Sequence, residues 1–211
     1  MNRMKITWLG HSCFKVEKNG YSIVLDPYAD GTVPGLASLR ESANRVYCSH
    51  EHGDHNGRSC VEIVTGIKSC PFEHTEIVSY HDDAMGSKRG TNTIHVLDDG
   101  EVRLVHMGDQ GCDLTVAQKT ILGKPDVLLI PVGGYYTIDA VQAKKLADEL
   151  GAKLIIPMHF RGESFGFDVI SEVTDFTGLY ENVTFAKVSE VTVPAVPETG
   201  TVLVLKPANA L

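Results

Sequence analysis

The chain has 211 residues, of which 43% are hydrophobic and 22% are charged, as is usual for a globular protein. Its 19 basic and 27 acidic side chains give a formal net charge of −8, which argues against broad attraction to nucleic acid. No apolar run reaches the roughly 18 residues of a membrane span, and the start "MNRMKITWLGHSCF" has no apolar signal segment. We expect a cytoplasmic protein with neither nucleic acid nor a membrane as partner.

Short strands with close turns are predicted for the first half of the chain. Asn19-Gly20 and Asp99-Gly100 are typical of the hairpin turns that join such strands. Apolar or alternating stretches predict strands at residues 4–10, 13–17, 21–26, 45–49, 76–83, 92–98 and 101–109. Two histidines of this half, His74 and His95, are interpreted as surface residues.

Apolar residues spaced three and four apart replace this pattern in the second half. They predict helices at residues 113–122 and 137–151, the second ending at Gly151. Buried strands are predicted at 126–134 and 153–160, a last helix at 168–180, and further strands near 183–193 and 201–205. Without a linker or a strong internal repeat, the chain is expected to form one mixed α/β domain over residues 1–211.

The stretch "SHEHGDHNG", residues 49–57, concentrates four metal-ligand side chains directly after a predicted strand. They are His50, His52, Asp54 and His55. Histidines spaced i, i+2 and i+5 do not share a helix face, and the glycines indicate a loop. A loop can direct several side chains toward one centre, and imidazole with carboxylate suits zinc, iron or manganese.

Further polar residues also follow predicted strands, where α/β folds build their sites. They are His11, Asp26, His81, His106 to Asp109, and His159. Two metals about 3.5–4 Å apart need roughly seven ligands, one of them often a bridging carboxylate. The set is complete if His50, His52 and one later histidine hold the first metal. Asp54, His55 and His159 would then hold the second, with Asp109 bridging both.

"HEHGDH" resembles the H-x-H-x-D-H motif of the metallo-β-lactamase superfamily. Its later ligands correspond in order to His81 in "YHDD", Asp109 in "HMGD" and His159 in "PMHF". "WLGHSCFKVE", "LDP", "PVGG" and "IIPMH" are similar to small stand-alone hydrolases of the branch related to L-ascorbate-6-phosphate lactonase. The resemblance implies an αββα sandwich of two mixed sheets flanked by helices, a di-metal centre and hydrolytic activity.

One departure from the family pattern concerns the third histidine of the first metal. Many members carry it in a "PGHT" turn that this chain lacks. "SYHDDAMG" occupies that interval and favours His81, while His106, three residues before Asp109, is the alternative.

Several residues near the candidate ligands have more than one interpretation. His11 is an alternative ligand, a neighbour of the ligands, a substrate contact or a structural residue. Asp26 is an alternative ligand, an orienting partner for a ligating histidine or a turn residue. Tyr135 and Tyr136 line the pocket or simply pack. The charges Lys88, Arg89 and Arg161 either contact an anionic group of the substrate or are solvated loop residues.

These observations predict a metal-dependent hydrolase that uses a metal-bound hydroxide on a small ester, lactone or phosphoester, which is anionic if the basic residues contact it. Asp54 would both hold a metal and carry a proton away from the nucleophile. Two divalent ions are expected, zinc first, with manganese or iron as alternatives. The rival functions are a phosphodiesterase acting on nucleic acid, a mononuclear iron oxygenase and a non-catalytic metal-binding protein. Association into a homo-oligomer is left open.

Overall fold

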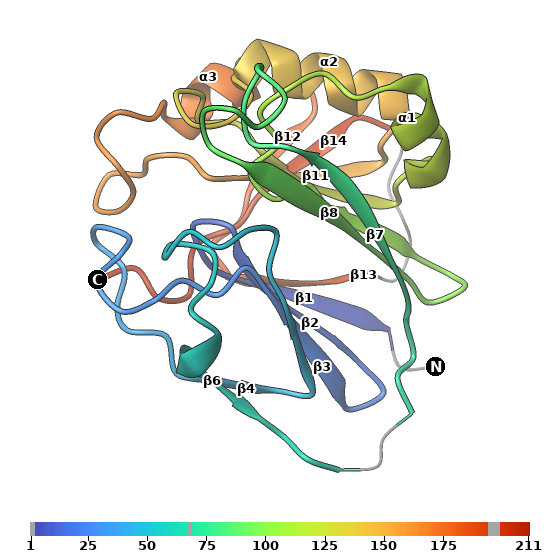
Figure 1. Ribbon diagram of the computed structural model, residues 1–211, viewed down its shortest axis with the longest axis vertical. Helices are drawn as coiled ribbons and strands as arrows, with labels where there is room; N and C mark the ends of the chain where they lie inside the picture. Colours follow the sequence, from blue (N-terminus) through green and yellow to red (C-terminus); the bar gives the residue numbers. More distant parts are fainter. Residues whose placement is uncertain (1–2, 67–68, 194–198) are drawn as a thin grey trace.

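Two mixed β-sheets pack face to face in the computed structural model, which describes residues 3–66, 69–193 and 199–211 (Figure 1). The first sheet has the strand order β13-β1-β2-β3-β5. It consists of β1 (Met4–Gly10), β2 (Cys13–Lys18), β3 (Tyr21–Leu25), β5 (Arg45–Tyr47) and β13 (Glu190–Val193). Asn19 and Gly20 close the hairpin between β2 and β3 with φ angles of 54° and 73°, the positive values that a two-residue hairpin turn needs.

The second sheet has the order β12-β14-β11-β10-β9-β8-β7. Its strands are β7 (Glu73–Tyr80), β8 (Thr91–Asp98), β9 (Arg103–His106), β10 (Val127–Pro131), β11 (Leu154–Met158), β12 (Val183–Phe185) and β14 (Thr201–Val204). Strands β9, β10, β11, β14 and β12 pair in parallel, whereas β7, β8 and β9 pair antiparallel. The central strands β10 and β11 are buried along their whole length, which explains their continuous apolar sequences.

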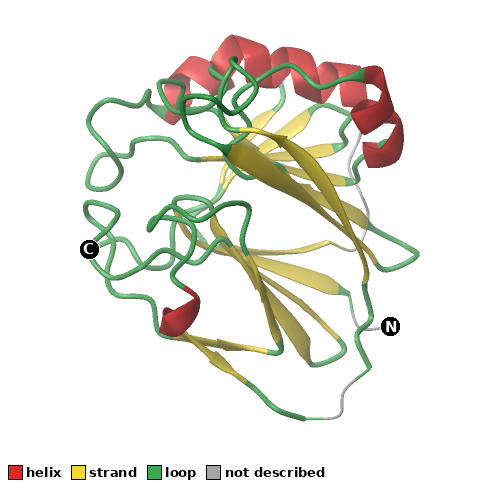
Figure 2. Cartoon of the chain, in the orientation of Figure 1, coloured by secondary structure: helices red, strands yellow, loops and turns green. Residues whose placement is uncertain are grey.

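The three α-helices of the described residues cover the outer face of the second sheet (Figure 2). They are α1 (Val116–Leu122), α2 (Ala140–Leu150) and α3 (Val173–Thr177). Capping boxes start α1 at Thr115 and α2 at Asp139, and Gly151 ends α2 in the left-handed conformation. The last helix is shorter than the predicted 168–180, because backbone hydrogen bonds of Ser171 to Arg161 and Gly133 hold that segment against the ends of β10 and β11.

A large apolar core fills the space between the two sheets. Trp8 and Phe14 from the first sheet belong to one buried cluster with Leu97, Leu104 and Ile156 from the second. Burying a side chain of this kind contributes about 1.5–3 kcal/mol. His95 also lies in this interior with 1% of its surface exposed, so its prediction as a surface residue was wrong.

An irregular layer covers the outer face of the first sheet. Leu9, Cys13 and Val24 turn away from the main core and pack against residues of the 27–43 segment such as Tyr28 and Leu39. The layer also contains β4 (Glu41–Ala43) paired with β6 (Val61–Ile63), and the short 3-10 helix η1 (Arg58–Cys60). The sequence predicted neither β4 nor β6, because three-residue strands in an irregular segment show no apolar pattern. The predicted α/β sandwich of two mixed sheets is confirmed. None of the helices in the described part of the chain is long and apolar enough to span a bilayer.

Candidate metal centre

The strands that precede the candidate ligands run in common directions. β1, β3 and β5 point one way in the first sheet, and β7, β9 and β11 share a direction in the second. The residues that follow these six strands meet at one rim of the sandwich, where a loop can turn its side chains across the gap between the sheets.

Three of these residues leave their strands in the left-handed conformation. His11, Asp26 and His159 have φ angles of 53°, 45° and 53°. Non-glycine residues rarely adopt positive φ, and each such residue costs on the order of 1–3 kcal/mol. These strained conformations lower the stability of the fold, and they turn three polar side chains toward the same rim.

Two groups of potential ligand atoms lie side by side at this rim. His50, His52 and His81 form the first group, and His11, Asp54, His55 and His159 form the second. Within each group the ligand atoms lie within 4.8 Å of one another. A third group, with ligand atoms equally close together, consists of His50, His55 and Asp109 and connects the two.

Asp109 occupies the position between the two groups. Its Oδ1 lies 3.2 Å from His55 Nε2, and its Oδ2 lies 3.3 Å from both His81 Nε2 and His159 Nε2. Asn92 fixes its backbone, since Asn92 Oδ1 accepts from the Asp109 N–H at 2.9 Å while Asn92 Nδ2 donates to the Met107 carbonyl at 2.9 Å. Sequence reasoning missed Asn92, although a polar residue inside an apolar strand was a signal.

The donor set fits divalent metal ions. Nε2 of His50, His55 and His159 are buried nitrogens that lie 3.2–3.9 Å from the Asp109 carboxylate but make no well-formed hydrogen bond in the described residues, an arrangement that normally costs stability. Burial lowers the pKa of His50 to about 3 and that of His11 to about 4, so both imidazoles are neutral near pH 7, as metal ligation requires. Metal ligation would satisfy the unpartnered nitrogens.

Asp26 supports the second group from behind. This fully buried carboxylate accepts from Ser49 N and Ser49 Oγ at 2.6 Å each and from His55 Nδ1 at 2.7 Å. Burial alone would raise the pKa of Asp26, but His55 and the Ser49 hydrogen bonds hold it well below its usual range. With the proton of His55 held at Nδ1, Nε2 is the nitrogen that faces Asp109.

His106 is held away from both groups by its own hydrogen bonds. Its Nε2 lies 2.9 Å from the Ser12 carbonyl, and the Gly108 N–H donates to its Nδ1 at 3.1 Å. Both nitrogens are therefore engaged, whereas His81 belongs to the first ligand group. His11, which the sequence left open, has its Nε2 3.3 Å from Asp54 Oδ2 in the second group.

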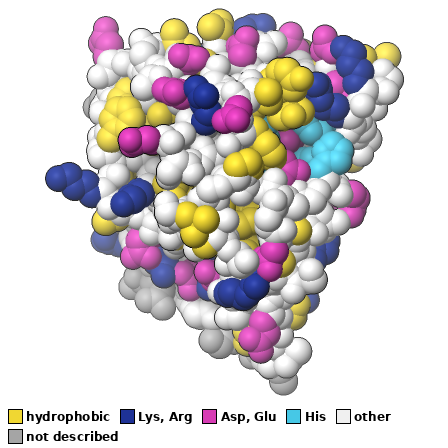
Figure 3. Space-filling view, turned by 90° about the vertical axis from the view of Figure 1, so that its left-hand side faces the viewer, with side chains coloured by type: hydrophobic (Ala, Val, Ile, Leu, Met, Phe, Trp, Pro, Cys, Tyr) yellow, Lys and Arg dark blue, Asp and Glu magenta, His cyan; other side chains and the backbone are white. Residues whose placement is uncertain are grey.

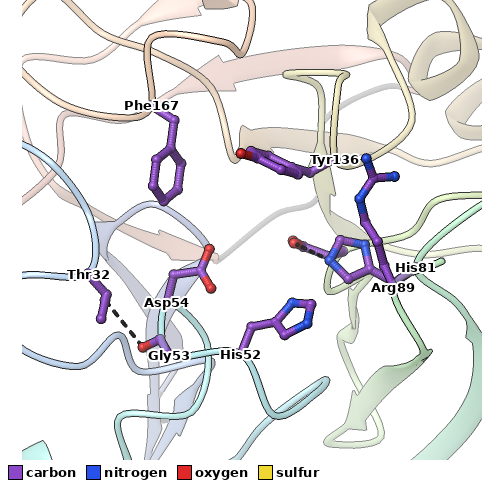
Figure 4. A pocket seen from close by; sticks show the side chains of 9 residues that line it. Thr32, His52, Gly53, Asp54, His81, Arg89, Tyr136 and Phe167 are labelled. Carbon is purple, nitrogen blue, oxygen red and sulfur yellow. Dashed lines mark hydrogen bonds and ion pairs between the residues drawn. The ribbon is translucent and has the colours of Figure 1, made fainter.

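A pocket of about 440 Å³ opens over these groups. His52 and Asp54 lie on one side of it, and Tyr136 and Phe167 lie on the other (Figure 4). Histidine reaches the surface beside acidic and basic side chains on the face shown in Figure 3. Of the two tyrosines with open interpretations, Tyr136 lines the pocket, while Tyr135 is largely exposed outside it.

The three candidate cations have different positions. The Arg89 guanidinium lines the pocket and lies 5.5 Å from the centre of the Tyr136 ring. Lys88 instead pairs with Asp83 at 2.6 Å, and Arg161 pairs with Glu172 at 2.9 Å beside a separate cavity. Asp82 accounts for the placement of Arg89, because it accepts backbone N–H bonds from Ala84, Gly86, Lys88 and Arg89 and so folds this loop back toward His81.

Comparisons with known proteins show the family to which the chain belongs. A family model described as "Beta-lactamase superfamily domain" matches residues 5–159. A UPF0173 metal-dependent hydrolase of Archaeoglobus fulgidus is 31% identical over 194 residues, covering 74% of this chain and 83% of the relative. The corresponding protein of Hyperthermus butylicus is 28% identical over 190 residues, covering 74% and 82%.

Solved structures show the same relationship. A Thermotoga maritima protein described as a Zn-dependent hydrolase of the metallo-β-lactamase superfamily superposes with a TM-score of 0.76 at 32% identity, covering 96% of this chain and 98% of that one. Igni18, a metallo hydrolase of Ignicoccus hospitalis, has a TM-score of 0.64 at 21% identity over 99% and 97% of the two chains, which shows the shared fold. The chain belongs to the metallo-β-lactamase superfamily and is a metal-dependent hydrolase of its UPF0173 family.

Proposed function

We propose that this hydrolase acts on a small ester, lactone or phosphoester at a binuclear metal centre. His50, His52 and His81 would hold one ion, and Asp54, His55 and His159 the other. The contacts of Asp109 with histidines of both groups, at 3.2 and 3.3 Å, carry the proposal, because a carboxylate in that position can bridge two ions. His11 is a further candidate ligand of the second ion. Zinc is the first choice of metal, with manganese or iron as alternatives.

In such a centre the metal ions and the protein side chains have different roles. A bound divalent ion supplies a nucleophile at neutral pH by lowering the pKa of water from about 15.7 toward 7. Asp54 combines a place in the second ligand group with a place in the pocket lining. We assign it the removal of the proton from the attacking water toward solvent. Tyr136 and Phe167 form the aromatic wall opposite Asp54.

The position of Arg89 favours an anionic substrate. In the part of the chain that the structure describes, no carboxylate lies within 4.0 Å of its guanidinium, although other arginines such as Arg40 and Arg161 are paired with acids. A carboxylate or phosphate of the substrate would fill that position in a bidentate fork. A phosphorylated lactone, the substrate type implied by the likeness to L-ascorbate-6-phosphate lactonase, would present both an anion for Arg89 and a carbonyl for attack.

Hydrolysis assays on matched anionic and neutral esters, lactones and phosphoesters test this proposal. Arg89→Met is expected to raise KM for the anionic members by about 10- to 100-fold, since a charged hydrogen bond is worth about 1.5–3 kcal/mol. Lys88→Met, the matched control from the same loop, should leave KM unchanged. Equal KM values for wild type and Arg89→Met on every anionic substrate would contradict this role of Arg89.

The alternative functions predict different assay results and metal contents. A phosphodiesterase acting on nucleic acid would cleave oligonucleotides in the same assays, and a mononuclear iron oxygenase would contain one iron and consume oxygen. The acidic chain and the limited pocket volume of about 440 Å³ favour a small molecule.

A further inference from the structure

A second cluster of metal-ligand side chains lies at the open edge between the two sheets. Strand β7 is an edge strand, and Glu76 on it stands directly opposite His95 on β8. His74 is two residues before Glu76 and therefore projects from the same face of the strand. We call His74, Glu76 and His95 the edge cluster. None of them belongs to the ligand groups of the candidate metal centre.

The spacing of the edge cluster is that of ligands around a single ion. His74 Nε2 lies 3.1 Å from His95 Nδ1, and Glu76 Oε1 lies 3.9 Å from the same nitrogen. Two nitrogens bound to a tetrahedral zinc at about 2.0–2.1 Å would be about 3.3–3.4 Å apart. All three ligand atoms lie within 4.8 Å of one another, so small rotations of the side chains would admit an ion.

The surroundings hold the two imidazoles in place and keep a route open to solvent. The Tyr47 ring, at the edge of the first sheet, stacks on His74 at 3.8 Å between ring centres and on His95 at 5.6 Å. His95 is buried, whereas the Glu76 side chain is 58% exposed. Burial lowers the pKa of His74, and it lowers that of His95 to about 4, so both rings are available in the neutral form.

We propose that the edge cluster is a second metal site, which takes a transition-metal dication of the zinc class through two imidazoles and one carboxylate. Water would occupy the remaining coordination positions of the ion on the solvent-exposed side. The ion would tie β7 to β8 at the point where Tyr47 of the first sheet packs against them. The site would be structural, since it lies outside the pocket of the candidate metal centre.

Metal counting on the whole chain tests the proposal. Chelator-stripped protein is dialysed to equilibrium against ZnCl₂, and separately against CoCl₂, and metal per chain is measured by elemental analysis. His74→Gln is expected to bind one equivalent less than wild type and to lose the corresponding part of the visible Co²⁺ absorption. Glu76→Gln, a conservative change at an exposed carboxylate, is expected to lower the affinity of the edge cluster for its ion at least tenfold.

Glu73→Gln is the matched control, because Glu73 lies on the same strand next to His74 but projects from the opposite face. It should bind as much metal as wild type. The candidate metal centre is intact in all of these proteins, so the difference of one equivalent stands however many ions that centre holds, and hydrolysis should be unchanged. Equal metal content in wild type, His74→Gln and Glu76→Gln would overturn the proposal.

Discussion

Replacement of Asp26 by asparagine tests how the fold prepares a ligating histidine. The variant keeps the shape of the side chain, and its Oδ1 can still accept from Ser49 N. Its amide nitrogen, however, takes the place of Oδ2, the atom that faces Ser49 Oγ at 2.6 Å and His55 Nδ1 at 2.7 Å. His55 Nδ1 must then accept instead of donate. Its proton moves to Nε2, the nitrogen that should bind metal.

The expected effect follows from this change of tautomer. Loss of a partner behind a ligating histidine typically weakens metal binding 10- to 100-fold, about 1.4–2.7 kcal/mol. Loss of one buried charged hydrogen bond should also lower the free energy of unfolding of the metal-free protein by about 1.5–3 kcal/mol. Competition with a chromophoric chelator measures the first quantity, and urea unfolding of the stripped protein measures the second.

Asp126→Asn provides the control for this experiment. Asp126 also accepts a backbone N–H, that of Arg103 at 2.8 Å, and pairs with Lys153 at 2.8 Å, but it lies before β10, away from the rim. Asp126→Asn should lower the free energy of unfolding without changing the affinity for metal. If Asp26→Asn binds metal as tightly as wild type, the orienting role of Asp26 is refuted.

Two further predictions concern the rim and the thiols. A methyl group on Gly133 would lie 2.1 Å from the His159 carbonyl, so Gly133→Ala should lower the free energy of unfolding by about 2–3 kcal/mol and reduce metal content. Gly66→Ala, where no atom of the described residues lies within 4 Å of the added methyl group, should do neither in the same urea and metal assays. Burial raises the pKa of Cys13 well above its usual value, so iodoacetamide at pH 8 should label the exposed Cys70 and spare Cys13 in the native protein. Labelling of Cys13 at a comparable rate, measured by peptide mass spectrometry, would contradict its burial.

Much of the site could be predicted because its residues are close in sequence or follow apolar strands. The "HEHGDH" loop concentrates its ligands within a few residues, and Asp26 and His159 each end a buried strand. Parallel strand ends then bring distant residues to one rim. The same reasoning favoured His81 but kept His106 as the alternative, because both lie at strand ends on that rim. What separates them is the hydrogen bond of His106 to the Ser12 carbonyl, a contact between the two sheets.

Features that depend on loop conformation could not be predicted from the sequence. Arg89 and Lys88 are neighbours, yet only Arg89 lines the pocket, because the backbone hydrogen bonds to Asp82 decide how the loop turns. The layer outside the first sheet depends on packing of a segment without periodicity. His95 was misplaced for a related reason, since its environment is created by Tyr47 from the other sheet.

Metal content per chain tests the central claim most directly, measured by elemental analysis on wild-type and Asp109→Ala forms of the protein. Both should carry His74→Gln, so that the edge cluster does not contribute to the count. A binuclear centre bridged by Asp109 predicts two metal ions per chain, falling to one or none when Asp109 is replaced. One ion per chain, unchanged by the replacement, would mean that Asp109 is not a ligand and that the bridged centre does not exist in this protein.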